Sequence, residues 1–387
     1  MTKKQLRVGM VGYNFMGKAH SNAWLKAAKF FALPCDVVMQ AVCGRTEEKV
    51  RAMAENWGWR SYETDWKRLI ERDDIDLIDI CTPNNSHAEI AIAAAKAGKA
   101  ITCEKPLAMN TKQAKTMVAA VQKAGVLNSV WFNYRRVPAV AFAQKLVAQG
   151  KIGRLFHVRA QYLQDWIIDP EFPLVWRLDA KVAGSGPHGD LNAHIIDMAR
   201  FITGDTITET IAHTHNFITE RPVGQTGEGL SAKAGAKTMK VTVEDAVIAM
   251  AKFKSGAIGT FEATRFAQGR KNGNRIELNG EKGSLYFEFE DMNHLYFYDA
   301  TAPAGLQGFT KLMCTDAKAH PYAAAWWPAG HIIGYEHSFI NQVSDVAKAW
   351  ATGNKAIALP DFADATVTQR VLDAMLDSAK QRKWVKV

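Results

Sequence analysis

The sequence predicts an α/β protein with two domains: a doubly wound parallel sheet in residues 1–132, and an α/β domain with a large, open, mostly antiparallel sheet in residues 133–387. Three observations lead to this prediction. Strand-like and helix-like segments alternate through the first region, and longer strands joined by tight turns dominate the second. A chain of 387 residues also exceeds what one compact core usually organises.

The first region alternates short apolar runs with amphipathic stretches. The expected strands are residues 6–11, 37–43, 75–81, 101–104 and 126–133, and the expected helices are residues 16–31, 47–57 and 86–97. Gly98 follows the last of these helices, at a position where glycine commonly ends a helix. Short strands separated by helices imply right-handed crossovers, so this sheet is expected to be parallel.

The pattern changes after Pro138. One helix, residues 138–149, precedes long strands at residues 155–162, 208–219, 243–254 and 257–265. Tight turns at 254–257 and 279–283 join neighbouring strands, which indicates an antiparallel sheet with helices on one face. Residues 222–237, rich in small residues and lysine, are expected to form an exposed loop, and residues 335–352 and 362–382 to form closing helices.

Composition and charge exclude several classes of protein. Hydrophobic residues make up 48% of the chain and charged residues 22%, which is typical of a globular protein. The formal net charge is +9, but the basic residues are spread along the chain without a five-residue run, so no nucleic-acid partner is expected. No apolar run reaches the roughly 20 residues of a membrane helix, so no membrane partner is expected either.

The cysteines and the first residues favour a cytoplasmic location. The five cysteines are an odd number without a CxxC pair, and several lie in apolar strand-like runs. The chain enters its first strand within a few residues of Met1, which leaves no room for a signal peptide. A reducing compartment accounts for both observations.

The loop between the first strand and the first helix has the position of a dinucleotide-binding fingerprint. The residues expected to hold the cofactor there are Gly12, Tyr13, Asn14, Phe15, Met16 and Gly17. Gly12 permits a tight turn and Gly17 a close approach of helix and strand, while the helix N-terminus offers N–H groups to the pyrophosphate. Asn14 replaces the second glycine, and asparagine tolerates a left-handed backbone better than most residues. The alternative is a purely structural turn.

The end of the second strand bears on the choice of cofactor. NAD-preferring proteins often carry an acid here for the ribose 2′-hydroxyl, whereas this chain has Gly44, Arg45 and Thr46. Gly44 leaves room, and Arg45 with Thr46 could meet a 2′-phosphate, which favours NADP over NAD. The alternative is that Arg45 stacks on adenine and Thr46 caps the next helix. The choice between NAD and NADP stays open at this point.

Three segments could supply chemistry to a nicotinamide pocket. Thr82, Pro83 and Asn84 follow the third strand, and Glu104-Lys105-Pro106 follows the next, at the sheet edge where ligands bind in doubly wound folds. Further along the chain, Asp190, His194 and Asp197 are spaced to share one helical face.

Oxidation of an alcohol by hydride transfer needs a base for the hydroxyl proton and a group that stabilises negative charge on oxygen. His194 suits the first task and Lys105 the second, while Asp190 could orient the imidazole or bind a hydroxyl. The alternatives are a solvated Lys105, a core His194 and an Asp190 that caps its helix. No cysteine or further histidine shares the spacing with Asp197, so no metal is expected.

Taken together, these motifs resemble the Gfo/Idh/MocA oxidoreductases. The matching residues are Gly12 to Gly17, Thr82-Pro83-Asn84-x-x-His87, Glu104-Lys105-Pro106 and Asp190-x-x-x-His194-x-x-Asp197. Within the family, the chain is most similar to dehydrogenases that act at the C3 hydroxyl of glucosides and of anhydro sugars such as levoglucosan. The supporting segments are Phe15–Ser21, Phe132–Arg136, Tyr162–Trp166, Trp176-Arg177 and Glu262–Arg265.

The resemblance implies a Rossmann domain followed by an α/β domain whose open sheet often mediates dimers or tetramers. It implies that Lys105, Asp190 and His194 are the catalytic residues, with His194 as proton acceptor. It also implies further contacts to the cofactor from Thr82, Pro83, Asn84, His87, Glu104, Lys105, Trp176 and Arg177.

The sugar pocket is a hypothesis from residue types. Tyr162, Trp166 and Trp176 could stack on the C–H faces of a pyranose. Its hydroxyls could be bound by Asn133, Arg135, Gln164 and Asp165, beside Lys105, Asp190 and His194. The alternative is that the aromatic residues belong to the core or to an interface. No dense cationic pocket is evident, which favours a neutral sugar over a phosphorylated one.

The function expected from these observations is NAD(P)-dependent oxidation of a secondary hydroxyl, at C3, of a neutral sugar, glucoside or anhydro sugar by a homodimer or homotetramer. One alternative is a glycosidase that retains its cofactor and oxidises the sugar only transiently. Another is a non-catalytic sugar or nucleotide sensor on the same fold. The combination of Lys105, Asp190 and His194 disfavours the sensor, because a sensor needs no base.

Overall fold

The computed structural model describes residues 3–226 and 233–387 and divides the chain into two compact units. The first contains residues 1–136 and 333–366, and the second residues 137–332 and 367–387. The sequence places a single division after residue 132. The observed units differ because residues 333–366 return to the first unit.

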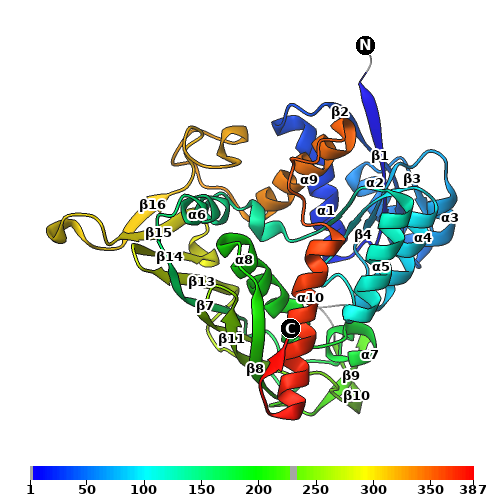
Figure 1. The fold of residues 1–387 in the computed structure, drawn as a ribbon. Helices are drawn as coiled ribbons and strands as arrows, with labels where there is room; N and C mark the ends of the chain where they lie inside the picture. Colours follow the sequence, from blue (N-terminus) through cyan, green and yellow to red (C-terminus); the bar gives the residue numbers. More distant parts are fainter. Residues whose placement is uncertain (1–2, 227–232) are drawn as a thin grey trace. The chain divides into compact units, whose positions relative to one another are not determined.

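The first unit is built on a six-stranded parallel sheet in the order β3-β2-β1-β4-β5-β6 (Figure 1). The strands are β1 (Lys4–Val11), β2 (Cys35–Cys43), β3 (Ser61–Glu63), β4 (Leu77–Ile80), β5 (Ala100–Cys103) and β6 (Asn128–Val130). The helices are α1 (Phe15–Phe30), α2 (Glu47–Trp57), α3 (Trp66–Glu71), α4 (His87–Lys96), α5 (Thr111–Ala124) and α9 (Tyr335–Thr352). The Rossmann prediction is confirmed.

The core of this unit explains why its strands read as apolar runs. Ile78 and Ile101 lie on neighbouring strands and are fully buried in one cluster with Ile90 of α4 and Met117 of α5. A parallel strand covered on both faces needs apolar side chains on both, which is the pattern of β4 and β5.

One predicted strand of this unit is wrong in its length. Residues 126–133 form only the short β6, and the chain then turns into a 3₁₀ helix at Asn133–Arg136. The turn is stabilised because the Asn133 amide donates to Ser338 Oγ of α9 at 2.8 Å. This partner lies 205 residues away, so the local sequence gives no sign of it.

The second unit contains a nine-stranded sheet in the order β16-β15-β14-β13-β7-β12-β11-β8-β17. Its strands are β7 (Leu155–Leu163), β8 (Ile207–His215), β11 (Ala246–Phe253), β12 (Ile258–Thr264), β13 (Gly273–Gly280), β14 (Gly283–Glu288), β15 (His294–Asp299), β16 (Thr310–Met313) and β17 (Val385–Lys386). β12 and β7 pair in parallel, and the other neighbours are antiparallel. The predicted mostly antiparallel sheet is confirmed.

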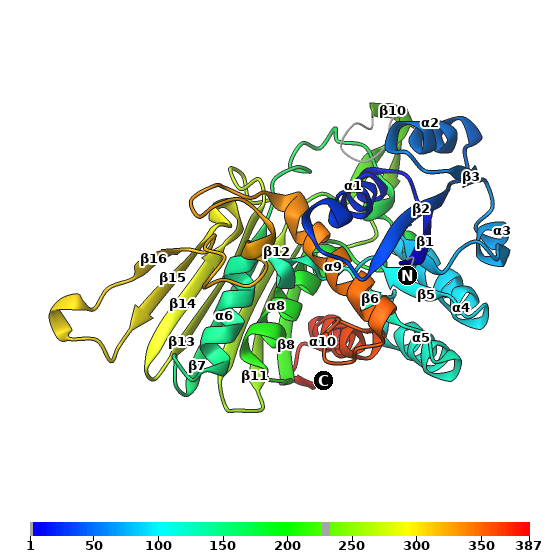
Figure 2. The same ribbon diagram turned by 90° about the horizontal axis from the view of Figure 1, so that it is seen from above.

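Helices cover one face of this sheet. α6 (Pro138–Ala148) lies on β14 and β15, and α8 (Ala193–Thr203) on β7 and β13 (Figure 2). Burial alternates accordingly along β11, where Val247 and Ala249 are buried and Ile248 and Met250 are exposed. The last helix, α10 (Phe362–Gln381), begins in the first unit and continues in the second.

The predicted loop at residues 222–237 is wrong in the part that the structure describes. β9 (Glu220–Thr226) and β10 (Lys233–Lys240) pair as a two-stranded antiparallel sheet, and residues 227–232 lie outside the described residues. The buried Arg221 anchors β9, because its guanidinium donates to the carbonyls of Ile167, Asp169 and Phe172. The described small residues of this segment therefore belong to two paired strands, β9 and β10, and not to a loop.

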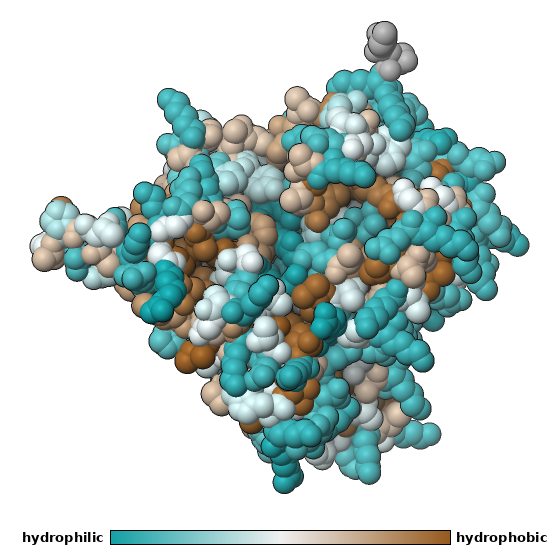
Figure 3. All heavy atoms as spheres, in the orientation of Figure 1, coloured by the Kyte–Doolittle hydropathy of each residue, from teal (hydrophilic) through white to brown (hydrophobic). Residues whose placement is uncertain are grey.

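The surface view agrees with the ordinary composition. Figure 3 shows hydrophilic side chains over most of the face in view, with apolar side chains gathered in separate patches. Among the described residues, no helix combines the length and apolar character needed to cross a bilayer. All five cysteines have free thiols.

Candidate active site

The loop between β1 and α1 has the shape of a phosphate cradle. Gly12 has a φ of 114°, and a Cβ atom there would lie 2.6 Å from the carbonyl oxygen of Cys81. A Cβ atom on Gly17 would lie 2.5 Å from the carbonyl oxygen of Gly12. Both positions therefore require glycine, because the loop is pressed against the end of β4 and against its own helix.

The N-terminus of α1 is open to an anion. Asn14 is the N-cap residue, but its side chain makes no capping hydrogen bond, and the first turn holds no acidic residue. Asn14 has a φ of −79°, so its tolerance of a left-handed backbone is not needed here. An extended backbone is open to any residue, and the second glycine of the fingerprint is replaced here without strain. The free N–H groups suit a pyrophosphate.

Gly44, at the end of β2, accommodates Tyr13 from the cofactor loop. A Cβ atom at residue 44 would overlap the Tyr13 ring. The room that the sequence leaves at Gly44 is therefore filled by this ring. Arg45 and Thr46 are exposed, and Thr46 occupies the N-cap position of α2 without a side-chain hydrogen bond.

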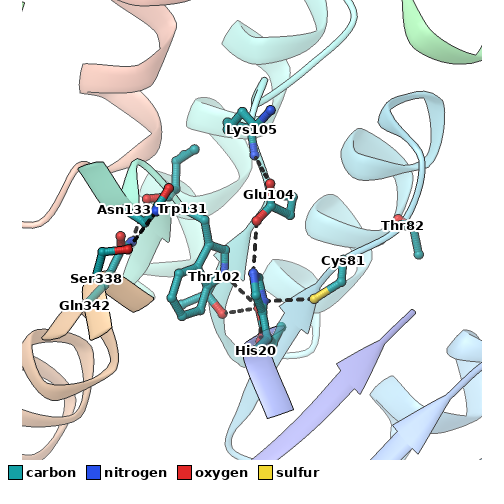
Figure 4. Close-up of polar contacts among 12 residues, drawn as sticks. His20, Cys81, Thr82, Thr102, Glu104, Lys105, Trp131, Asn133, Ser338 and Gln342 are labelled. Atoms are coloured by element: carbon teal, nitrogen blue, oxygen red, sulfur yellow. Dashed lines mark hydrogen bonds and ion pairs between the residues drawn. The ribbon is translucent and has the colours of Figure 1, made fainter. Parts of the chain in front are cut away.

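A buried polar network joins α1, β4 and β5 (Figure 4). His20 of α1 is fully buried, with Nδ1 at 3.0 Å from Asp79 Oδ2 and Nε2 at 2.9 Å from Glu104 Oε1. Asp79 also accepts hydrogen bonds from Trp24, Trp131 and Thr102, at 2.7, 2.8 and 2.8 Å. Every one of these groups lies in the first unit.

The geometry makes His20 an imidazolium. Both ring nitrogens face carboxylate oxygens, which only accept, so both must carry a proton. Burial lowers the pKa of His20, but Cys81 and Asp79 outweigh it, and the pKa lies well above its ordinary value. Burial raises the pKa of Asp79, and His20 with the two indole N–H groups more than reverses this, so Asp79 stays ionised.

The candidate catalytic lysine follows this network directly. The backbone N–H of Lys105 donates to Glu104 Oε2 at 3.1 Å, and the Lys105–Pro106 peptide bond is cis. His87 holds the next part of the loop, with Nδ1 at 3.0 Å from the carbonyl oxygen of Pro106 and Nε2 at 2.9 Å from that of Thr82. Two loops at the carboxyl edge of the sheet are thereby tied together.

The neighbouring 3₁₀ turn completes this edge. Asn84 is buried in the turn Asn84–Ser86. Ser86 Oγ donates to Thr82 Oγ1 at 2.6 Å, and also reaches the carbonyl oxygen of Pro83 at 2.8 Å. The structure thus brings together the cofactor-contacting residues predicted at Thr82, Pro83, Asn84 and His87 with Glu104 and Lys105.

In the second unit, Asp190 lies between two arginines. Arg265, at the end of β12, is almost fully buried and donates from Nη2 to Asp190 Oδ2 at 2.7 Å. Arg177 Nε lies 3.7 Å from the same oxygen. Asp190 therefore does not cap its helix but takes part in a charged cluster beside Trp176, over which the Arg177 guanidinium stacks at 4.3 Å.

The predicted single α-helical face of Asp190, His194 and Asp197 is only partly correct. Asp190 lies in a π-helical turn at His188–Asn192, and α8 begins at Ala193. A π-turn adds a residue per turn and rotates Asp190 away from the α-helical periodicity. π-turns are frequent at functional sites, which agrees with the role expected for Asp190. His194 and Asp197 are buried on α8.

Polar and aromatic residues from the end of β7 lie beside this cluster. The Tyr162 hydroxyl and the Gln164 amide both donate to Asn272 Oδ1, at 2.8 and 3.0 Å, and the Trp166 indole donates to Gln164. The ring of Tyr162 lies 5.9 Å from that of His194. These side chains are therefore ordered by one another, as a sugar-binding surface requires.

Three predicted sugar-binding residues have partners elsewhere. Asp165 accepts from Lys271 at 2.8 Å and from the backbone N–H of Gly269. Asn133 and Arg135 belong to the first unit, where Asn133 binds Ser338 and Arg135 forms an ion pair with Asp364 at 2.5 Å. These contacts account for the three side chains structurally, and their contact with a sugar stays a prediction.

Sequence reasoning missed His20, Asp79 and Arg265. His20 and Arg265 lie in segments that carry the family resemblance, but neither received a role. Asp79 stands inside the apolar run Leu77–Ile80, and a carboxylate in a buried strand signals a buried partner.

His20, Asp79 and Cys81 have the residue types of a metal site, since their ligand atoms lie within 4.8 Å of one another. Asp79 is already saturated by hydrogen bonds, so the arrangement is better described as a protein network.

Comparison with known proteins identifies a family for two parts of the chain. Residues 6–132 match the oxidoreductase family with an NAD-binding Rossmann fold, and residues 140–286 match the GFO/IDH/MocA C-terminal domain. The chain is 40% identical over 389 residues to levoglucosan dehydrogenase of Pseudarthrobacter phenanthrenivorans, covering 99% of this chain and 98% of the relative. It is 27% identical over 272 residues to D-glucoside 3-dehydrogenase of Escherichia coli, covering 69% and 72%.

Solved structures give the same result. An oxidoreductase domain protein from Kribbella flavida is 53% identical, with a TM-score of 0.94 over 100% of both chains. Levoglucosan dehydrogenase in complex with NADH and levoglucosan is 40% identical, with a TM-score of 0.92 over 99% of both chains. The chain therefore belongs to the Gfo/Idh/MocA family of oxidoreductases, with an NAD-binding Rossmann domain at residues 6–132.

Proposed function

We propose that this protein oxidises the C3 hydroxyl of a neutral sugar, glucoside or anhydro sugar to the ketone, reversibly, with a nicotinamide dinucleotide. The observation that carries the proposal is full-length similarity to levoglucosan dehydrogenase in a chain that holds Lys105, Asp190 and His194. Levoglucosan and simple glucosides are the first substrates to test.

The three residues divide the chemistry. When bound, the nicotinamide supplies the acceptor for the hydride. His194 takes the hydroxyl proton, and Lys105 donates a hydrogen bond to the oxygen as negative charge develops on it. Asp190, held by Arg265, accepts a hydrogen bond from a sugar hydroxyl and orients the ring.

A neutral pyranose suits the groups of the second unit. The Tyr162 and Trp166 rings offer flat apolar surfaces, and Gln164 and Asn272 offer amide groups beside them. The two arginines near Asp190 are already engaged by its carboxylate, which disfavours a phosphorylated sugar.

We propose NAD(H) as the preferred cofactor, although Gly44, Arg45 and Thr46 favour NADP on residue type. The Tyr13 ring fills the space at Gly44, and a relative 40% identical to this chain has been solved with NADH. The test is kcat/KM with NAD+ and with NADP+, for the wild type and Arg45→Ala. A higher value with NADP+ that the variant loses would assign Arg45 to the 2′-phosphate and overturn this preference.

We propose that the exposed face of the nine-stranded sheet joins subunits in a homodimer or homotetramer. Ile248, Met250 and Ile258 are 59%, 51% and 54% exposed and lie on the face opposite α6 and α8. Adjacent exposed apolar side chains on a flat sheet are typical of an interface. Ile248→Lys/Met250→Lys should lower the mass measured by light scattering, and an unchanged mass would exclude this face.

The catalytic proposal is tested by absorbance at the nicotinamide band. Levoglucosan, methyl glucosides and free monosaccharides are assayed with each cofactor for the wild type, Lys105→Met and His194→Ala. We expect each substitution to lower kcat by about 10²–10⁴-fold while cofactor binding stays intact. Wild-type turnover in either variant would rule out its role. Cleavage of a glucoside without net change of NAD(P)H would instead establish the glycosidase alternative.

A further inference from the structure

We propose that His20 is a positioning residue for Lys105 and acts through Glu104, an inference that rests on the catalytic role proposed for Lys105. The Glu104 carboxylate has two oxygens with two different tasks. Oε1 lies 2.9 Å from His20 Nε2, and Oε2 accepts the backbone N–H of Lys105 at 3.1 Å. One buried carboxylate therefore connects the imidazolium to the peptide group from which the lysine side chain projects (Figure 4).

The His20 ring is itself held rigidly. Nδ1 lies 3.0 Å from Asp79 Oδ2 and 2.9 Å from Cys81 Sγ, and Nε2 faces Glu104. The ring centroid is 4.1 Å from that of Trp131 and 5.6 Å from that of Phe339. A ring fixed at both nitrogens and packed against two aromatic rings cannot turn. It therefore holds Glu104, which follows β5, at a fixed distance from Asp79 of β4.

Stability alone does not account for such an arrangement. Two carboxylates and an imidazolium are withdrawn from water here, and a buried ion pair commonly contributes no more to stability than well-packed apolar residues would. A positioning role does account for it, because hydride transfer is sensitive to displacements of about 1 Å in the groups around the substrate.

Removal of His20 leaves Asp79 and Glu104 buried without their shared cation. Asp79 keeps the hydrogen bonds from Trp24, Trp131 and Thr102, whereas in the described part of the chain the side-chain partner of Glu104 is His20. We therefore expect the Glu104 carboxylate to shift, and the peptide group of Lys105, which is hydrogen-bonded to it, to shift with it.

A double-mutant cycle tests the proposal on the full-length protein with NADH and levoglucosan. The variants are His20→Gln, Lys105→Met and the double variant. His20→Gln should lower kcat by about ten- to a hundredfold, with the Kd for NADH within twofold of wild type. Added to Lys105→Met, it should cause no further loss, because both changes remove the same contribution.

Thr102→Val is the matched control. It removes a buried hydrogen bond to Asp79 without touching the His20–Glu104 contact, so it should lower Tm but leave kcat within about twofold. If His20→Gln does not fold, Glu104→Gln takes its place in the cycle, since an amide keeps the shape and loses the charge.

The outcomes separate the two proposals. Wild-type kcat in His20→Gln, equal losses in Thr102→Val, or losses that multiply in the double variant would each overturn the positioning role. Wild-type kcat in Lys105→Met would instead overturn the proposed function, whatever His20→Gln does. A lower kcat in both single variants, with no further loss in the double variant, supports both the positioning role and the proposed function.

Discussion

Each unit holds its candidate catalytic residues with a buried cation, but the two cations differ. In the first unit, the His20 imidazolium binds Glu104, which precedes Lys105. In the second, the Arg265 guanidinium binds Asp190. An imidazolium can lose its charge within the range of ordinary buffers, whereas a guanidinium cannot. A rise in pH can therefore remove the charge that binds Glu104 but not the charge that binds Asp190.

His188, one of the buried histidines of the second unit, differs from His20 in its charge. His188 lies in the π-turn with Nε2 at 2.8 Å from the carbonyl oxygen of Leu372 and Nδ1 at 3.1 Å from the Asn192 amide. One nitrogen donates and the other accepts, which is the pattern of a neutral ring. Burial lowers the pKa of His188 to about 4. His20 and His188 should therefore change the stability of the protein with pH in opposite directions.

The largest effect is expected from Arg265→Met. The substitution removes the 2.7 Å hydrogen bond from the buried guanidinium to Asp190, so kcat/KM should fall about a hundredfold and the free energy of unfolding by about 2 kcal/mol. Steady-state kinetics and urea unfolding measure the two quantities. Arg275→Met, at a half-exposed arginine that pairs with Glu277, should change the stability by less than about 0.5 kcal/mol. Equal losses of kcat/KM and stability in the two variants would contradict this expectation.

His188 should make the protein less stable in acid. Because the pKa of His188 is lowered from 6.5 to about 4 on folding, the unfolded chain binds the proton more tightly between these values. The free energy of unfolding lost through the buried, neutral His188 should be near zero above pH 6.5 and grow to about 3 kcal/mol near pH 4. In unfolding measurements from pH 8 to 4, His188→Gln should lose less stability than the wild type. Parallel curves for the two proteins would contradict this.

His20 should show the reverse. Its pKa is raised well above 6.5 on folding, so its stabilising contribution is complete below pH 6.5 and is lost as the pH rises towards the folded-state pKa. The stability difference between wild type and His20→Gln should shrink by about 1.4 kcal/mol per pH unit above 6.5. His213→Gln, at an exposed position on β8, serves as the control. A difference that grows with pH would show that His20 is not a buried cation.

The smallest effect is expected from Arg177→Met. Arg177 is 3.7 Å from Asp190, and both side chains are partly exposed, so the ion pair should contribute about 0.5 kcal/mol or less. kcat/KM should fall only a few-fold. A loss as large as that of Arg265→Met would mean that exposed and buried arginines act alike on Asp190.

The sequence predicted helices and strands well where neighbouring residues alone determine them. The helix predicted at residues 47–57 and that at residues 335–352 have the observed bounds, because their apolar positions repeat within a few turns. The parallel sheet of the first unit followed from the alternation of strands with helices. The cofactor loop and Glu104-Lys105-Pro106 could be proposed as site segments because they are short motifs at strand ends.

The remainder depends on contacts between distant residues. His20 and Glu104 are 84 residues apart, and Asp190 and Arg265 are 75 apart, so no window of sequence contains either pair. The ribbon of β9 and β10 was mistaken for a loop because its composition is dominated by small residues, while its backbone pairing and the Arg221 anchor are invisible locally. The roles of the individual site residues stay predictions.

The return of residues 333–366 to the first unit has a consequence for biosynthesis and engineering. Gln342 of α9 donates to the carbonyl oxygen of Val130 in β6, and Asn341 to that of Arg136. A ribosome must therefore translate eight strands of the nine-stranded sheet, all except β17, before the nucleotide-binding half can be completed. For the same reason, a chimaera joined at residue 136 would exchange an unfinished module, and a functional exchange of this half needs both of its segments.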